Sequence, residues 1–237
     1  MIGPDHFGFS ISGAAAEFFV AKPSWLHRLP DELSWTMGAL VEPFSVAYYA
    51  LVRAGGVDAS DTVAVLGAGP IGLAVAAAAG AMGARTVVVE PAAPRRAAAG
   101  KLGADPVPPD QAEDLLAELT GGRGADVVVE ASGNPAVMAR ALELAGFRGR
   151  VACIGIDVGG TAPARLGLIQ SKELRVTGSI GSPGVWPETL RFLARSTVDL
   201  TPLVTHRFPV DRALDALAAA QQPASTIKAH VELDATP

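Results

Sequence analysis

The chain has 237 residues, of which 49% are hydrophobic and 18% are charged, and its formal net charge is −5. This is the composition of a globular chain long enough to bury a core, and it excludes the basic surface typical of nucleic-acid binding. The sequence contains no run of basic residues of the kind that binds a membrane surface, and its first residues do not resemble a signal peptide. The single cysteine, Cys153, excludes an internal disulfide and a Cys-x-x-Cys zinc site, so we expect a cytoplasmic protein.

From residue 62 onward, short β-branched runs alternate with helical patterns. The predicted strands are 62–67, 85–90, 105–108, 125–132, 149–156 and 173–181. The predicted helices are 70–83, 93–104, 112–120, 135–145 and 186–196. Strands rich in Val and Ile that alternate with helices are typical of a parallel sheet covered on both faces. We therefore predict an α/β fold with a six-stranded, doubly wound parallel sheet of the Rossmann type.

The two flanks of this unit carry no core of their own. Residues 13–34 contain a strand-like piece and a proline-bounded loop, and residues 206–237 predict a loop, a short helix and a final strand. Neither flank is long enough to form a domain alone. We expect the two flanks to belong together to a second unit.

Three glycines, Gly67, Gly69 and Gly72, form a G-x-G-x-x-G pattern between the first predicted strand and its helix. In such a turn the first glycine permits the tight bend and the second lets the backbone approach a pyrophosphate. The third lets the helix pack close to the sheet. The N–H groups at the start of the helix then face the anion. The pattern predicts a dinucleotide-binding turn, and the alternative is a glycine turn that serves packing alone.

Glu90 ends the second predicted strand, about 20 residues after the glycine pattern, where a ribose-binding acid is expected. A carboxylate there binds the 2′-hydroxyl of NAD and repels the 2′-phosphate of NADP. Arg95 and Arg96 follow closely, and an arginine can hold a phosphate, stack on adenine or remain solvated. The alternative for Glu90 is a solvated strand end. The sequence favours NAD as the cofactor.

Other chemically active residues form no convincing site. The four histidines are dispersed, at His6, His27, His206 and His230. Cys153 lies inside a predicted strand and is typical of a small buried side chain. Ser132 and Ser179 have no histidine nearby in the sequence, so a hydrolytic triad is not favoured. We predict no metal site.

Five stretches cover most of the chain: LVEPFSVAYYALVRAGG, VLGAGPIGLAVAAAAGAMGA, GADVVVEASGNPAVMARALELAGFRGRVACIG, KELRVTGSIG and THRFPVDRALDAL. In this order they resemble the zinc-type medium-chain dehydrogenase/reductase family, and within it the sorbitol, threonine and related polyol dehydrogenases. The resemblance implies a remnant of a GroES-like catalytic domain at 1–38, a NAD-binding Rossmann domain at 39–205, and a segment returning to the catalytic domain at 206–237.

The resemblance also implies the cofactor contacts, which lie where an open α/β sheet places its ligand. The mapped positions are Gly67, Gly69, Pro70, Ile71 and Gly72 for the pyrophosphate, Glu90 and Arg95 for the adenosine ribose, Ala131 and Ser132 bordering the cofactor, and Ile154, Gly155, Ser179 and Ile180 near the nicotinamide.

The chain also departs from the family pattern. It has no early zinc-ligand cysteine, no Gly-His-Glu motif and no four-cysteine lobe, so we expect about a hundred residues, a domain's worth, to be missing before Met1. Glu42, in the stretch VEP, matches a zinc-proximal residue of polyol dehydrogenases and is the candidate catalytic group. A single carboxylate does not hold zinc, which needs about three protein ligands. The alternative for Glu42 is an acid that favours a helix start.

The resemblance implies an oxidoreductase that transfers a hydride between NAD(H) and an alcohol or ketone of the polyol type. The alternatives are a NAD-binding or interaction protein with reduced catalysis, and a fragment of a longer dehydrogenase. It also implies a homodimer that pairs the sixth strands of two chains, and the predicted strand 173–181 has no proline or lysine in its middle to discourage pairing. The alternative is a monomer whose sheet edge is covered by its own C-terminal segment.

Overall fold

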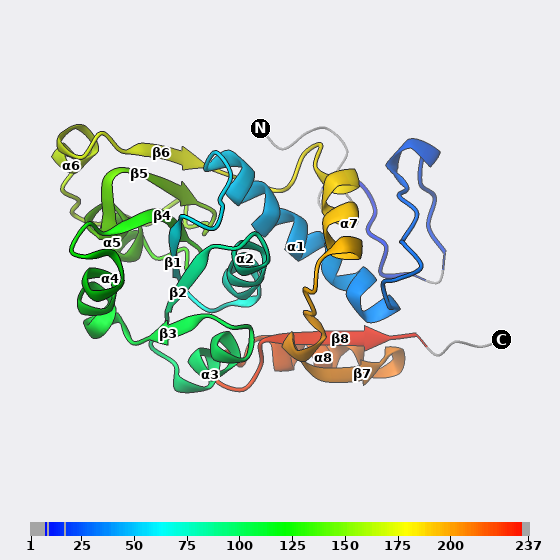
Figure 1. The fold of residues 1–237 in the computed structure, drawn as a ribbon. Coiled ribbons are helices and arrows are strands. Elements are labelled where there is room, and N and C mark those ends of the chain that lie inside the picture. Colours follow the sequence, from blue (N-terminus) through cyan, green and yellow to red (C-terminus); the bar gives the residue numbers. More distant parts are fainter. Residues whose placement is uncertain (1–7, 9, 17, 234–237) are drawn as a thin grey trace.

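The computed structural model describes residues 8, 10–16 and 18–233 (Figure 1). Its main sheet contains β1 (Thr62–Leu66), β2 (Arg85–Val89), β3 (Asp105–Val107), β4 (Ala125–Glu130), β5 (Ala145–Cys153) and β6 (Arg175–Gly178). The strands are parallel in the order β3-β2-β1-β4-β5-β6. The six-stranded, doubly wound sheet predicted from the sequence is therefore confirmed.

Helices cover both faces of this sheet (Figure 1). In chain order they are α1 (Trp35–Arg53), α2 (Pro70–Ala81), α3 (Ala93–Lys101), α4 (Ala112–Thr120), α5 (Pro135–Leu144), α6 (Gly167–Ser171) and α7 (Trp186–Arg195). Two short 3-10 helices, η2 (Pro109–Gln111) and η3 (Thr201–Leu203), lie in the connections. The predicted helices are all present, and α1 and α6 are additional.

The alternation of side chains along the strands builds a core on each face. In β1, Val63 and Val65 pack with α1, α2 and α7, whereas Ala64 and Leu66 pack with α4 and α5. Successive side chains of a strand point to opposite faces, so a strand covered on both sides must be apolar throughout. This is why the central strands read as continuous apolar runs in the sequence.

Helix α1 is the element that the sequence patterns missed. Ser34 caps it by accepting a hydrogen bond from the N–H of Met37, with 3.2 Å between oxygen and nitrogen. Pro43 lies inside the helix and removes one backbone donor, which hid the helical pattern. The expected boundary between residues 38 and 39 falls within this helix.

The C-terminal flank forms a small lobe made of β7 (Val204–Pro209), the 3-10 helix η4 (Val210–Arg212), α8 (Ala213–Ala220) and β8 (Lys228–Glu232). Strands β7 and β8 are parallel neighbours in a separate two-stranded sheet. The short helix and the final strand were expected, but the expected loop at its start is strand β7. Its pairing partner lies more than twenty residues later, so local patterns could not reveal it.

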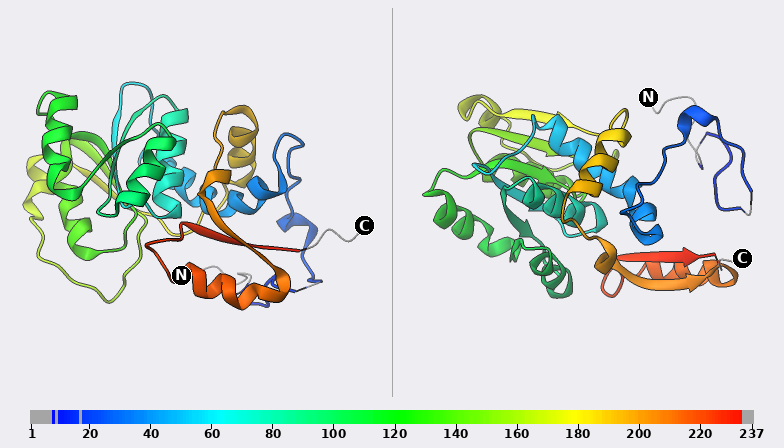
Figure 2. Two further views of the ribbon diagram at one scale, coloured as in Figure 1. Left: turned by 90° about the horizontal axis from the view of Figure 1, so that it is seen from below. Right: turned by 45° about the vertical axis from the view of Figure 1, so that its right-hand side comes forward.

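The N-terminal flank differs from its prediction. The strand-like piece is not a strand: its described residues, 13–16 and 18–22, precede η1 (Pro23–Trp25) and belong to no helix or strand. The two flanks lie at the same end of the molecule, beyond α1 and α7 (Figures 1 and 2). Within the described part of the chain, no helix is long and apolar enough to cross a membrane.

Candidate functional site

The three glycines of the pattern occupy the turn from β1 into α2 and have different environments. Gly67 has a φ of +104°, and a Cβ there would lie 3.2 Å from the backbone nitrogen of Ser132. A Cβ on Gly72 would lie only 2.0 Å from the carbonyl oxygen of Gly67. A Cβ on Gly69 would meet only Nη1 of Arg95, at 4.0 Å. Gly67 and Gly72 therefore serve the backbone fold, whereas Gly69 faces an open side.

The start of α2 presents backbone donors to that open side. Gly69 is the N-cap residue and has no side chain to accept from the first turn, and Pro70 follows it. The first N–H groups of a helix have no partners within the helix and carry the positive end of its dipole. A pyrophosphate placed beside Gly69 would satisfy them. Pro70, Ile71 and Gly72 thus lie where the sequence predicted an anion site.

Glu90 is buried beneath this turn, with 6% of its surface exposed. The N–H of Ala68 donates to its Oε2 at 2.8 Å, and the N–H of Ala92 donates to its Oε1 at 2.9 Å. The carboxylate therefore joins the end of β2 to the glycine turn, and the alternative of a solvated strand end is wrong. Each carboxylate oxygen accepts one hydrogen bond here and has room for another, which the hydroxyl of a ribose could donate.

The two arginines that follow Glu90 bind backbone carbonyl groups. Arg95 donates through Nε to the oxygen of Pro223 at 3.0 Å and through Nη2 to that of Thr226 at 3.4 Å. Arg96 donates through Nη1 to the carbonyl oxygen of Glu90 at 2.8 Å. Arg95 therefore links α3 to the segment that precedes β8. This contact was not foreseen from the sequence, because its two ends lie far apart along the chain.

The loops after β4 and β5 adjoin the glycine turn. The N–H of Ala131 donates to the carbonyl oxygen of Leu66 at the end of β1, at 2.9 Å. Ile154 and Gly155 follow β5, and both of their N–H groups donate to the carbonyl oxygen of Glu130, at 2.9 Å and 3.1 Å. The structure thus brings the candidate residues of both loops together at the carboxyl edge of the sheet.

Glu130 is a residue at this edge of the sheet that the sequence analysis did not single out. It is fully buried at the end of β4, and its Oε1 accepts from both the N–H and the hydroxyl of Ser132, at 2.7 Å and 2.5 Å. The available signal was an acidic residue at the carboxyl end of the run ADVVVE, because a charge is rarely buried without a partner.

After β6, the chain returns towards α1. The N–H of Ser179 donates to the carbonyl oxygen of Cys153 at 3.0 Å, whereas its hydroxyl is buried without a partner among the described residues. Ile180 is largely exposed. The hydroxyl groups of Ser45 and Ser182 lie 2.7 Å apart and attach this loop to α1. Ser179 and Ile180 are therefore at the predicted edge of the sheet.

Glu42 lies on the exposed side of α1, and its backbone carbonyl accepts from the hydroxyl of Ser45 at 2.7 Å. In the part of the chain that the structure describes, no three His, Cys, Asp or Glu side chains gather where they could hold a metal ion. These residues do not fit a catalytic zinc, which needs about three protein ligands. Glu42 alone does not make such a site.

The described histidines have other surroundings. His27 stacks on Trp186 with 5.8 Å between ring centroids, and His206 stacks on Phe208 at 6.3 Å. Burial and the charge of Arg207 lower the pKa of His230 below its usual value. His6 lies outside the described residues. Cys153 is half-buried, and burial raises the pKa of its thiol to about 11, so it is a poor nucleophile at neutral pH.

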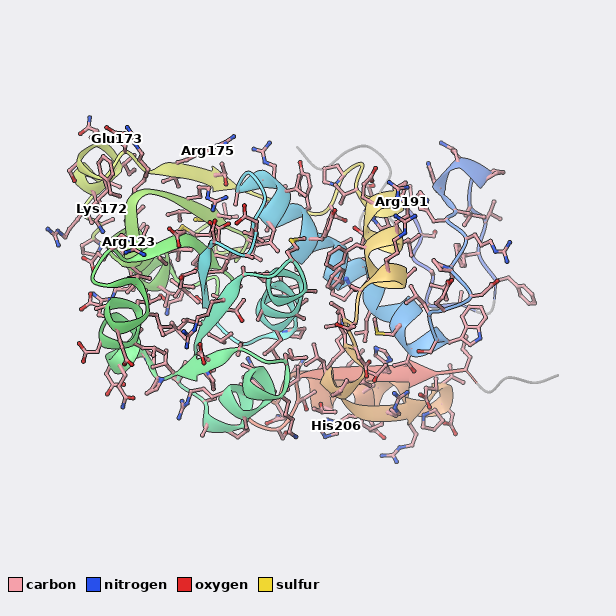
Figure 3. The ribbon with its side chains drawn as sticks, viewed as in Figure 1. Arg123, Lys172, Glu173, Arg175, Arg191 and His206 are labelled. Carbon is pink, nitrogen blue, oxygen red and sulfur yellow. The ribbon has the colours of Figure 1, made fainter. Side chains whose placement is uncertain are left out.

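A second group of charged side chains lies at the amino ends of the strands, away from the candidate site. Figure 3 shows Arg123, Lys172, Glu173 and Arg175 near the beginnings of β4 and β6, and His206 on the lobe. The Nζ of Lys172 donates to three carbonyl oxygens at the end of α5 and the start of β5. Since these carbonyls lack helical partners, the contact of Lys172 stabilises the helix end.

One cavity, of about 710 Å³, lies between α2, α3 and the lobe. Its lining includes Arg95, Lys101, Asp199 and Thr226. It is therefore bounded on one side by the contact between Arg95 and the segment before β8, and it extends along α2 and α3 away from the glycine turn.

Comparison with known proteins shows that this chain is similar in sequence to dehydrogenases. The family model described as "Zinc-binding dehydrogenase" matches residues 70–195. The chain is 33% identical over 216 residues to sorbitol dehydrogenase of Bacillus subtilis, covering 90% of this chain and 61% of that protein. It is 37% identical over 203 residues to (R,R)-butanediol dehydrogenase of the same organism, covering 84% of this chain and 58% of that protein.

Solved structures give the same result. The alcohol dehydrogenase TADH from Thermus sp. ATN1 superposes with a TM-score of 0.84 at 27% identity, covering 94% of this chain and 66% of that one. The chain spans about three fifths of the length of the two curated relatives above.

Proposed function

Because the chain belongs to the zinc-binding dehydrogenase family, we propose that it binds NAD(H) and serves hydride transfer between the nicotinamide and an alcohol or ketone of the polyol type. The observation that carries this proposal is the turn of Gly67, Gly69 and Gly72 with the buried carboxylate of Glu90 beneath it. The activity of the whole enzyme is a proposal, because the chain covers about three fifths of the length of these relatives.

The residues of the turn would hold the dinucleotide in two ways. The open side of Gly69 and the first turn of α2 would bind the pyrophosphate, and the free acceptor positions of Glu90 would bind the adenosine ribose. The nicotinamide, when bound, supplies the hydride acceptor. The loops after β4, β5 and β6, which hold Ser132 and Ser179, would border it. Glu42 remains the proposed proton-handling group, and no step is derived through zinc.

We propose NAD rather than NADP because of the surroundings of the ribose position. The carboxylate of Glu90 is held in place by two N–H donors, and a 2′-phosphate would bring a second negative charge against it. Arg95 and Arg96 use part of their donor capacity on backbone carbonyl oxygens, which limits how far they can compensate such a charge. A cytoplasmic location is part of the same proposal, since a NAD(H)-linked chain with one cysteine suits a reducing compartment.

Calorimetry with NADH and NADPH tests this function. We expect NADH to bind more tightly, and we expect Gly69→Val to abolish the binding because the side chain fills the open side of the turn. Gly80→Val is the matched control, since Gly80 is exposed on the same helix and a Cβ there touches nothing within 4 Å. Tighter binding of NADPH would contradict the role of Glu90. Binding without oxidation of any polyol would favour the non-catalytic alternative.

We also propose a two-fold dimer through β6. Among the described residues this strand pairs only with β5, and its Val176 is 43% exposed. Pairing of two such edges would join two sheets and bury apolar surface on both chains. Light scattering should give about twice the single-chain mass of 24.2 kDa. Val176→Lys should return it to the single-chain mass, and a wild-type monomer would contradict the dimer.

A further inference from the structure

The carboxylate of Glu130 is the most unusual polar group in the described part of the chain. Its side chain is fully buried. Oε1 accepts three hydrogen bonds, from the N–H and hydroxyl of Ser132 and from the N–H of Gly133 at 3.0 Å. Oε2 is buried and has no partner among the described residues. A buried charged oxygen without a partner is costly, so its retention calls for a physical reason.

Glu130 lies at the junction of two loops that touch each other. Its backbone oxygen accepts from Ile154 and Gly155, which follow β5. A Cβ on Gly155 would lie 2.1 Å from the nitrogen of Gly133 and 2.6 Å from Oε2 of Glu130. The loop after β4 and the loop after β5 are therefore in direct contact, and the side chain and the backbone of one residue bind both of them.

The same residue also sets the position of the glycine turn. Ser132, held by Oε1 of Glu130, has its backbone nitrogen 3.2 Å from where a Cβ of Gly67 would stand. The loop after β4 thus packs closely against the turn that starts α2. Any shift of Ser132 changes the spacing between the turn and the loop.

We propose that Glu130 is a positioning residue that sets the nicotinamide half of the dinucleotide site through Ser132, Gly133 and Gly155. This inference rests on the proposed NAD(H) binding. In an open α/β sheet the dinucleotide crosses the switch point between β1 and β4. Since Glu90 places the adenosine half over β2, the other half lies over β4, β5 and β6, on the loops that Glu130 holds.

A carboxylate suits this position better than an amide. Three donors converge on Oε1, and hydrogen bonds to a charged acceptor are stronger than those to a neutral one. Glu130→Gln keeps the volume but weakens these bonds and places an NH₂ group against Gly155. We expect the loops to loosen while the adenosine half, held by Glu90, stays intact.

Binding of two ligands to the full chain separates these halves. NADH affinity is measured by its fluorescence, and the affinity for ADP-ribose, which lacks the nicotinamide, is measured by calorimetry. We expect Glu130→Gln to weaken NADH about tenfold and to leave ADP-ribose within a factor of two. Glu90→Gln should weaken both ligands, because it alters the half that they share.

A second variant distinguishes the proposed role of Glu130 from a general folding defect. Ser132→Ala removes the hydroxyl that donates to Oε1 and accepts from the N–H of Asn134, while the backbone donors to Oε1 stay, and we expect about a threefold loss of NADH affinity with ADP-ribose unchanged. A loss of stability alone would reduce both ligands in proportion. Equal effects on both ligands, or none on NADH, would overturn the role of Glu130. Failure of the wild-type chain to bind either ligand would overturn the proposed function and this inference with it.

Discussion

The main sheet and the C-terminal lobe are both built from parallel strands joined by a helix, but they differ in burial. Strand β1 buries four of its five residues, whereas β7 and β8 have no buried residue. Helix α8 buries only Ala216 and exposes Leu214 by 80% and Leu217 by 63%. A sheet covered on both faces makes two cores, and two strands with one helix cannot do so.

The N-terminal flank resembles the lobe in this respect. Phe18 and Trp35 are almost fully exposed, and this flank lies at the same end of the molecule as the lobe (Figure 2). The comparison shows that burial is concentrated in the sheet unit, whereas both flanks leave large apolar side chains exposed.

The largest expected effect is in the glycine turn of the sheet unit. Gly72→Ala places a Cβ 2.0 Å from the carbonyl oxygen of Gly67, so the start of α2 must move. We expect a loss of about 3 kcal/mol in the free energy of unfolding, measured with urea. Gly80→Ala, in the open part of the same helix, should instead stabilise by about 0.5–1 kcal/mol. Equal effects of the two variants would contradict the close packing at Gly72.

A smaller effect is expected at the ion pair that ties the sheet unit to the end of α1. Arg150, on β5, binds the largely buried Asp61 and donates to the carbonyl oxygen of Gly56 at 2.5 Å. Arg150→Met removes the cationic partner of that carboxylate and leaves it the N–H of Asp58, so we expect a loss of about 2 kcal/mol in the free energy of unfolding. The control is Arg148→Met, whose exposed pair with Glu173 should cost less than about 1 kcal/mol. Both losses are measured by urea unfolding, and a loss from Arg148→Met as large as that from Arg150→Met would contradict the prediction.

The contact between the two regions should have a weaker and local effect. Arg95→Met removes the donors to the carbonyl oxygens of Pro223 and Thr226. We expect amide hydrogen exchange in β8 to become about fivefold faster, while exchange in β1 is unchanged. Arg96→Met is the matched control, because Arg96 binds only carbonyls near its own helix. Unchanged exchange in β8 would mean that Arg95 does not hold the lobe.

The smallest effect on stability is expected within the lobe itself. Leu214→Ser changes an exposed position, so the free energy of unfolding should stay within about 0.5 kcal/mol of the wild type. Binding of a dye that reports exposed apolar surface should decrease. Leu116→Ser, at a buried position of α4, is the control and should cost more than about 2 kcal/mol. A large loss from Leu214→Ser would show that this face is covered.

Prediction from the sequence succeeded where structure depends on neighbours along the chain. The apolar run at 62–67 and the helix at 70–83 correspond to β1 and α2, because burial on both faces and the glycine turn leave local signatures. It failed for α1, where Pro43 obscures the helical pattern, and for β7, which forms only beside β8. The loops predicted to border the cofactor lie together at the carboxyl edge of the sheet, and their binding role stays a prediction; Glu130 was not among the predicted residues.

The sequence by itself determined the six strands of the main sheet and most of the helices between them, the position of the glycine turn, and the acid at the end of β2. Tertiary structure alone decided what the charged groups bind. Glu90 accepts a hydrogen bond from Ala68, 22 residues away, and Arg95 donates one to Pro223, 128 residues away. Local spacing encodes periodicity and turns, whereas a buried charge takes whichever donors or acceptors the packed loops bring to it. For this reason the hydrogen bonds of Glu130 follow from the contact between the loops after β4 and β5 and not from its position in the sequence.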